Sequence, residues 1–138
     1  MDRLKVLIVE DEEVMQLLWR AEIEEKVGDG GEVLQAFTKE EGDLLLDAHA
    51  PDIAVMVVDA CVLGKVPNTI PLVEKARKLL GEQRPIIAVS GKEEFQRMLA
   101  AAGCNYLCSQ KCDPLCPEKQ QLPQMVADRL LDLSDVHL

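Results

Sequence analysis

The sequence is poor in aromatic side chains and contains no long apolar segment. Only 3% of the 138 residues are aromatic, so aliphatic side chains must fill most of the core. The longest apolar run, residues 53–58, is far shorter than the roughly 18 residues that a membrane span needs. The chain does not open with the basic-then-apolar pattern of a signal peptide. We therefore expect a cytoplasmic protein that does not insert into a membrane.

Positive charge is also scarce. Lys and Arg number 15 against 25 Asp and Glu, which gives a formal net charge of −10. A surface with this balance repels the phosphates of nucleic acids and of anionic lipids, so direct nucleic-acid binding is not expected. Internal repeats, low-complexity tracts and Ser/Gly linkers are absent from the sequence, and the length suits one domain, which we assign to residues 1–138.

Short β-branched runs occupy residues 6–9, 53–58 and 86–89. Each run is continuous rather than alternating, which is typical of strands buried on both faces of a parallel sheet. Segments of helical period lie between the runs, and two weaker strands, at residues 32–36 and 106–109, complete a repeated strand-helix alternation. The pattern predicts an α/β fold with a doubly wound parallel five-stranded sheet and helices on both of its faces.

The first predicted helix spans residues 12–26. Val14, Leu17, Leu18, Ala21 and Ile23 fall close to one face of this helix, and we expect that face to be buried.

Capping residues mark the ends of the other predicted helices. Thr38 with Glu41 fits a capping box, and Asn68 is the predicted cap of the third helix, which Gly81 ends. Gly103 ends a fourth helix over residues 93–102, and a fifth is expected over residues 122–133.

Polar side chains follow each of the three apolar runs. Glu10 and Asp11 come after the first, Asp59 after the second and Ser90 after the third. Ligands of open α/β sheets bind beyond the carboxyl ends of the strands, where these side chains would meet. Carboxylates brought so close favour a cation, and Mg²⁺ is held by one or two carboxylates with water and phosphate oxygens. A single acid after a strand is commonly a cap or a solvated turn, but the whole set favours a magnesium site.

In these residues the chain resembles the receiver domains of two-component response regulators. The matching segments are Lys5-Val-Leu-Ile-Val-Glu-Asp-Glu12, residues 51–59, residues 85–91 and residues 102–107, with Lys111 downstream. The resemblance implies a flavodoxin-like (βα)5 fold with strand order 2-1-3-4-5. It also implies a signalling phosphoacceptor rather than an enzyme, which takes a phosphoryl group from a histidine kinase or phosphotransfer protein and then contacts a downstream protein.

The same resemblance implies roles for individual residues. Asp59 would accept the phosphoryl group, while Ser90 and Lys111 would hold its oxygens. Ser90 and Tyr106 would form the switch, although Tyr106 can equally be read as an ordinary half-buried sheet tyrosine. The remaining roles are Mg²⁺ binding, by Glu10, Asp11, Asp59 and the backbone carbonyl of Cys61, and tuning of the acyl-phosphate lifetime, by Cys61, Gly91 and Lys92.

Two segments depart from the family pattern. Residues 60–68 replace the usual turn after the phosphoacceptor, and Lys111 lies five residues after Tyr106 where the family spacing is three. Cys112 also stands where a proline usually follows the lysine. These departures leave open a receiver-like interaction module that works without phosphorylation.

A further alternative concerns the thiols of residues 104–116. Four of the five cysteines recur at every fourth position, which suggests a metal or redox site, whereas the simpler interpretation is small buried or exposed thiols. The four are Cys104, Cys108, Cys112 and Cys116.

Overall fold

Five parallel strands form one sheet in the computed structural model, which describes residues 4–109 and 121–136. The order across the sheet is β2-β1-β3-β4-β5, so the predicted fold class and strand order are confirmed. Each of the three apolar runs lies within a central strand of this sheet. The strands are β1 (Leu4–Val9), β2 (Gly31–Ala36), β3 (Ile53–Asp59), β4 (Ile86–Val89) and β5 (Tyr106–Cys108).

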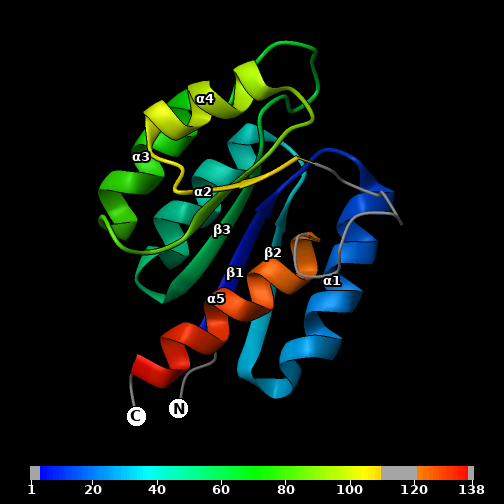
Figure 1. Cartoon of the computed structure of the whole chain (residues 1–138), viewed down its shortest axis with the longest axis vertical. Coiled ribbons are helices and arrows are strands. Elements are labelled where there is room, and N and C mark those ends of the chain that lie inside the picture. The colour runs from blue at the N-terminus through cyan, green and yellow to red at the C-terminus, as the bar shows by residue number, and fades with distance from the viewer. Residues whose placement is uncertain (1–3, 110–120, 137–138) are drawn as a thin grey trace.

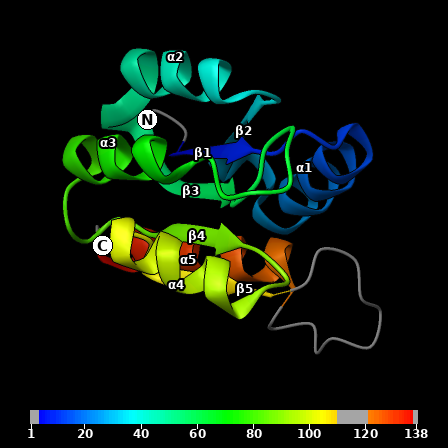
Figure 2. The same cartoon turned by 90° about the horizontal axis from the view of Figure 1, so that it is seen from above.

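Helices cover both faces of the sheet (Figures 1 and 2). One face carries α1 (Glu13–Val27) and α5 (Leu122–Val136), which pack against each other as well as against the strands. The other face carries α2 (Lys39–His49), α3 (Ile70–Leu80) and α4 (Glu93–Ala102). Among these helices none is long and apolar enough to cross a bilayer.

The central strands are continuous apolar runs because a hydrophobic core lies on each face of the sheet. Val6 and Ile8 of β1 face the α1 and α5 side, whereas Leu7 and Val9 face α2, α3 and α4, and all four are fully buried. Burying such a side chain contributes about 1.5–3 kcal/mol relative to leaving it exposed. Gly42 lets α2 lie close to the sheet, since a Cβ at this position would come 3.1 Å from Val9 and 3.2 Å from Leu72.

The predicted buried face of α1 is wrong in most of its residues. Val14 and Leu17 are 68% and 67% exposed and Leu18 is 44% exposed, so only Ile23 of the predicted apolar face lies in the core. The helix carries a second apolar stripe at a spacing of four, and the large indole of its central residue fixes which stripe faces the sheet. The buried side chains are Met15, Gln16, Trp19 and Ile23.

The predicted caps agree with the structure at three of four positions. Thr38 Oγ1 accepts a hydrogen bond from the Glu41 N–H at 3.0 Å, as a capping box requires. Gly81 and Gly103 end α3 and α4 with φ values of +85° and +139°, which favour glycine. Asn68 does not cap α3, because its side chain is bonded to Val62 and Thr69 is the residue at the cap.

Candidate functional site

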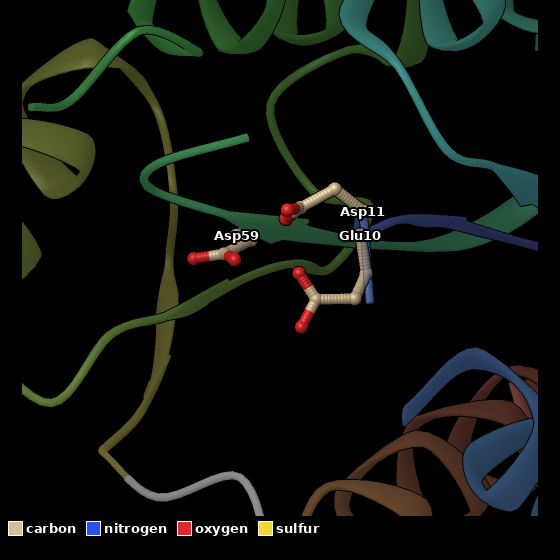
Figure 3. A group of neighbouring side chains, drawn as sticks. All are labelled: Glu10, Asp11 and Asp59. Carbon is tan, nitrogen blue, oxygen red and sulfur yellow. The ribbon is translucent and has the colours of Figure 1, made fainter. Parts of the chain in front are cut away.

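Three carboxylates meet at the carboxyl edge of the sheet. Glu10 and Asp11 follow β1, and Asp59 is the last residue of the neighbouring strand β3. Because Val9 pairs with Val58, the next residues of the two strands lie beside each other. One carboxylate oxygen from each acid lies within 4.8 Å of the others, and the side chains point toward a common space (Figure 3). The sequence therefore predicted correctly that these acids converge.

The donor set of this cluster fits a hard divalent cation. Its oxygens all come from carboxylates, Glu10 is fully buried, Asp59 is 6% exposed, and Asp11 is half-buried. The Cys61 N–H donates a hydrogen bond to Asp59 Oδ1 at 3.3 Å, which places the Cys61 backbone beside the cluster. Three negative charges this close repel one another, so a bound cation would relieve a cost that the fold otherwise carries.

A cavity of about 470 Å³ opens over Asp11 and Asp59. Ser90 lines it from the end of β4 and is 7% exposed, and its Oγ accepts a hydrogen bond from the Lys92 N–H at 3.1 Å. Every tuning and switching position predicted at the ends of β3 and β4 lies in this wall. The cavity also has lining residues that the sequence did not predict as part of the site. The predicted members are Cys61, Ser90, Gly91 and Lys92, and the others are Glu12, Gly64, Lys65 and Phe95.

A buried glutamine holds the strand ends that carry the acids. Gln16 of α1 is fully buried, and its Nε2 lies 3.1 Å from the carbonyl oxygens of Ile8 and Glu10 and 2.9 Å from that of Ala36. The Gln35 amide donates to the Gln16 backbone carbonyl at 3.0 Å. The amide thus ties α1 to the ends of β1 and β2 and fixes the backbone of Glu10. The sequence does not identify Gln16 as a core residue, because core positions are predicted from apolar side chains.

Replacing this glutamine by leucine is expected to destabilise the fold. In Gln16→Leu the carbonyls lose their shared donor, which costs about 1–3 kcal/mol in the free energy of unfolding. Urea denaturation followed by circular dichroism measures this cost. Gln83→Leu, at an exposed loop position, is the matched control and should change stability by less than about 0.5 kcal/mol. Equal effects in the two variants would mean that the amide does not hold the strand ends.

The structure places Tyr106, a predicted switch residue, outside the wall of this cavity. The Tyr106 ring is half-buried on the α5 side of the sheet, with the Arg129 guanidinium 4.7 Å from its centroid. It does not line the cavity over Asp59. Lys111 lies outside the described residues.

The thiols that the structure describes at residues 104–108 do not form a joint site. Cys104 packs in the core on the α2, α3 and α4 side of the sheet, and Cys108 packs in the core on the α1 and α5 side. Burial raises the pKa of the Cys104 thiol to about 12, and the Arg77 guanidinium opposes this increase only in part. A neutral buried thiol is a poor metal ligand and a poor nucleophile. Cys112 and Cys116 lie outside the described residues.

Alkylation should report this difference among the thiols. At pH 8, iodoacetamide is expected to modify the half-buried Cys61 of the native protein and to leave Cys104 and Cys108 unmodified, since both of these are buried. The raised pKa of Cys104 also leaves that thiol with almost no thiolate. Peptide mapping by mass spectrometry measures the modification, and protein unfolded in urea should react at all three positions. Rapid labelling of Cys104 in the native protein would contradict the assigned burial.

Solved structures of two-component receiver domains share the fold of this chain. A probable two-component response regulator/GGDEF domain protein superposes with a TM-score of 0.72 at 23% identity, over 95% of this chain and 50% of that one, so this chain spans about half its length. The receiver domain of the hybrid histidine kinase CckA gives 0.63 at 25% identity, over 91% and 98%. The structure of a CheX-CheY-BeF3-Mg²⁺ complex from Borrelia burgdorferi gives 0.65 at 19% identity, over 95% and 89%.

The similarity of this chain to known proteins is found by comparing structures and not by comparing sequences. Neither a model of a known protein family nor a curated protein sequence matches the chain. The strand order and the helices on both faces are those of the flavodoxin-like receiver fold. The chain thus has the fold of response regulator receiver domains, with an acidic cluster at the carboxyl edge of its sheet.

Proposed function

We propose that this chain is a phosphoacceptor receiver of a two-component phosphorelay. It takes a phosphoryl group onto Asp59 from the phosphohistidine of a histidine kinase or phosphotransfer protein, with Mg²⁺, and signals by contacting another protein. It is a signalling protein rather than an enzyme that turns over a substrate. The observation that carries the proposal is the cluster of Glu10, Asp11 and Asp59, whose oxygens lie within 4.8 Å of one another below an open cavity.

Asp59 is the nucleophile of the proposed transfer. A carboxylate oxygen of Asp59 bonds to phosphorus while the bond from phosphorus to the donor imidazole nitrogen breaks, and the electron pair stays on that nitrogen. The hydrogen bond from the Cys61 N–H to Oδ1 orients the carboxylate toward the cavity. Such a transfer depends on positioning and on neutralisation of the phosphoryl oxygens more than on covalent chemistry by the protein.

Glu10, Asp11, Asp59 and the backbone carbonyl of Cys61 would hold the Mg²⁺. When bound, the ion neutralises the carboxylates and the phosphoryl oxygens. Ser90 lines the cavity wall, and we propose that its Oγ donates a hydrogen bond to one phosphoryl oxygen and that Lys111 binds another. Gly91 also lines the cavity, and its lack of a side chain is proposed to leave room for the phosphoryl group to enter.

Ser90 and Tyr106 form the proposed switch. The Ser90 N–H donates to the Cys108 carbonyl at 3.1 Å, so a movement at the end of β4 acts directly on the strand that carries Tyr106. The Tyr106 ring packs against Arg129 of α5, and a shift of β5 would change that contact. Cys61 and Lys92, at the cavity wall, are proposed to control how water reaches the acyl phosphate.

Phosphorylation by a small donor tests this function. Incubation with Mg²⁺ and acetyl phosphate is expected to add the mass of one phosphoryl group to the intact protein, and chelation of Mg²⁺ is expected to prevent the addition. Hydroxylamine should remove the group rapidly, because it cleaves acyl phosphates and leaves phosphoserine intact. Absence of labelling together with absence of Mg²⁺ affinity would instead favour the interaction module that works without phosphorylation.

A further inference from the structure

The loop between β3 and α3 has a defined shape, although it lacks the turn that the family pattern predicts. The Asn68 side chain accepts a hydrogen bond from the Val62 N–H at 2.9 Å and donates one to the Val62 carbonyl at 2.6 Å, which closes residues 62–68 into a ring. Thr69 Oγ1 donates to the Asp59 carbonyl at 2.9 Å. These bonds anchor both ends of the loop at the end of β3, so its tip has a fixed place relative to Asp59.

The tip of this loop forms one wall of the acidic cavity. Gly64 and Lys65 line the cavity together with Ser90 and Lys92. Leu63 adopts φ +56°, a conformation that non-glycine residues seldom take, and this turns the chain just before Gly64 and Lys65. The loop therefore brings a lysine to the mouth of the cavity that contains Asp59.

Lys65 differs from the other lysine of the cavity in what it contacts. The Lys92 ammonium lies 5.0 Å from the centroid of the Phe95 ring, in a cation–π contact. Lys65 is exposed, and within residues 4–109 and 121–136 it makes no hydrogen bond, ion pair or ring contact. Its ammonium is thus available to a ligand in the cavity.

The cavity is strongly negative, so a lysine at its mouth can reduce the repulsion of a phosphoryl group. Asp11, Glu12 and Asp59 line the cavity and Glu10 lies beneath it, so an anionic donor approaches a strongly negative surface. A phosphoryl group on Asp59 carries about two negative charges in place of the one on the carboxylate, so the site becomes more negative by about one charge. A divalent cation offsets only part of this charge, and a cation at the cavity mouth would lower the repulsion of both the donor and the product.

We propose that Lys65 binds the phosphoryl group of the donor and of phosphorylated Asp59. This inference rests on the proposed function and adds to it a cationic residue from the loop in which the chain departs from its family. The ligand that Lys65 recognises is the phosphoryl dianion itself, whether a small phosphodonor or a phosphohistidine delivers it.

Two binding titrations with opposite expected changes test this role. The variants are Lys65→Gln, Lys65→Arg and the control Lys78→Gln, which removes the same charge from an exposed position of α3. Isothermal calorimetry gives the affinity for Mg²⁺ alone and for beryllium fluoride in saturating Mg²⁺, since beryllofluoride imitates a phosphoryl group on a carboxylate. The initial rate of labelling by acetyl phosphate is the third measurement.

In Lys65→Gln, beryllofluoride affinity and labelling rate should fall by about five- to tenfold, the effect of one partly exposed charge-assisted hydrogen bond. Mg²⁺ affinity should rise by about twofold, because a positive charge has left the neighbourhood of the acids. Lys65→Arg should recover most of the loss, and Lys78→Gln should resemble the wild type. A general structural defect would instead lower the affinity for both Mg²⁺ and beryllofluoride.

The outcomes separate the two proposals. If the wild type binds beryllofluoride and Lys65→Gln binds it equally well, the role of Lys65 is overturned and the proposed function stands. A parallel loss of Mg²⁺ and beryllofluoride affinity also overturns the role, because it indicates damage to the acid cluster. If the wild type binds neither ligand, the proposed function fails and this inference fails with it.

Discussion

Asp59→Asn is expected to abolish phosphorylation of the protein. The amide has nearly the volume of the carboxylate, but its oxygen is a far weaker nucleophile, and loss of a nucleophile typically lowers a rate by about a thousandfold or more. Intact-mass spectrometry after incubation with Mg²⁺ and acetyl phosphate measures the result. The variant should remain folded, because the amide oxygen can still accept the hydrogen bond that the Cys61 N–H gives to Asp59 Oδ1 in the wild type.

The matched control for this variant is Asp52→Asn. Asp52 precedes the first residue of β3, at the opposite edge of the sheet from Asp59, and its side chain is 51% exposed. This change removes the same charge from the neighbourhood of the same strand, yet labelling should proceed at the wild-type rate. Full labelling of Asp59→Asn would mean that another side chain accepts the phosphoryl group.

Asp11→Asn is expected to weaken Mg²⁺ binding by about 10- to 100-fold, since a neutral amide oxygen replaces one of the carboxylates that would hold the ion. The same change should raise the free energy of unfolding in metal-free buffer by about 1 kcal/mol, because it removes one of three negative charges that lie within 4.8 Å. Calorimetric Mg²⁺ titration and urea denaturation with EDTA measure the two effects.

Glu12→Gln is the control for this pair of effects. Glu12 lines the same cavity, but the three-carboxylate cluster does not include it. Its replacement removes the same charge and should change Mg²⁺ affinity by no more than about twofold. Similar losses of affinity in Asp11→Asn and Glu12→Gln would show that general acidity attracts the ion, rather than a defined set of ligands.

The sequence predicts the sheet of this protein well because the sheet is buried on both faces. Because both faces of a central strand are buried, nearly all of its residues are apolar and many are β-branched. Such continuous runs identify β1, β3 and β4 without reference to the helices. The orientation of α1 is mispredicted for the opposite reason. This helix carries two apolar stripes, and the packing of Trp19 and Met15 against the sheet, rather than the spacing of Val14, Leu17 and Leu18, selects the buried one.

The residues of the candidate site that follow directly after strands can be predicted from the sequence, whereas those in loops cannot. Glu10, Asp11 and Asp59 converge because parallel strands end at one edge, which is a property of topology. Lys65 could not be inferred, since its place follows from the hydrogen bonds that Asn68 makes across the loop and not from any periodic pattern. The burial of Gln16 in α1 could not be predicted either, because hydropathy patterns assign polar residues to the surface.

Chemical trapping of the acyl phosphate can show directly that Asp59 is the residue that accepts the phosphoryl group. Borohydride reduces an aspartyl phosphate to homoserine, so reduction of the labelled protein followed by peptide sequencing in the mass spectrometer locates the accepting residue. We expect homoserine at position 59, in the peptide that contains β3, and only after incubation with both Mg²⁺ and phosphodonor. Homoserine at any other position, or labelled protein that borohydride leaves unchanged, would contradict this assignment.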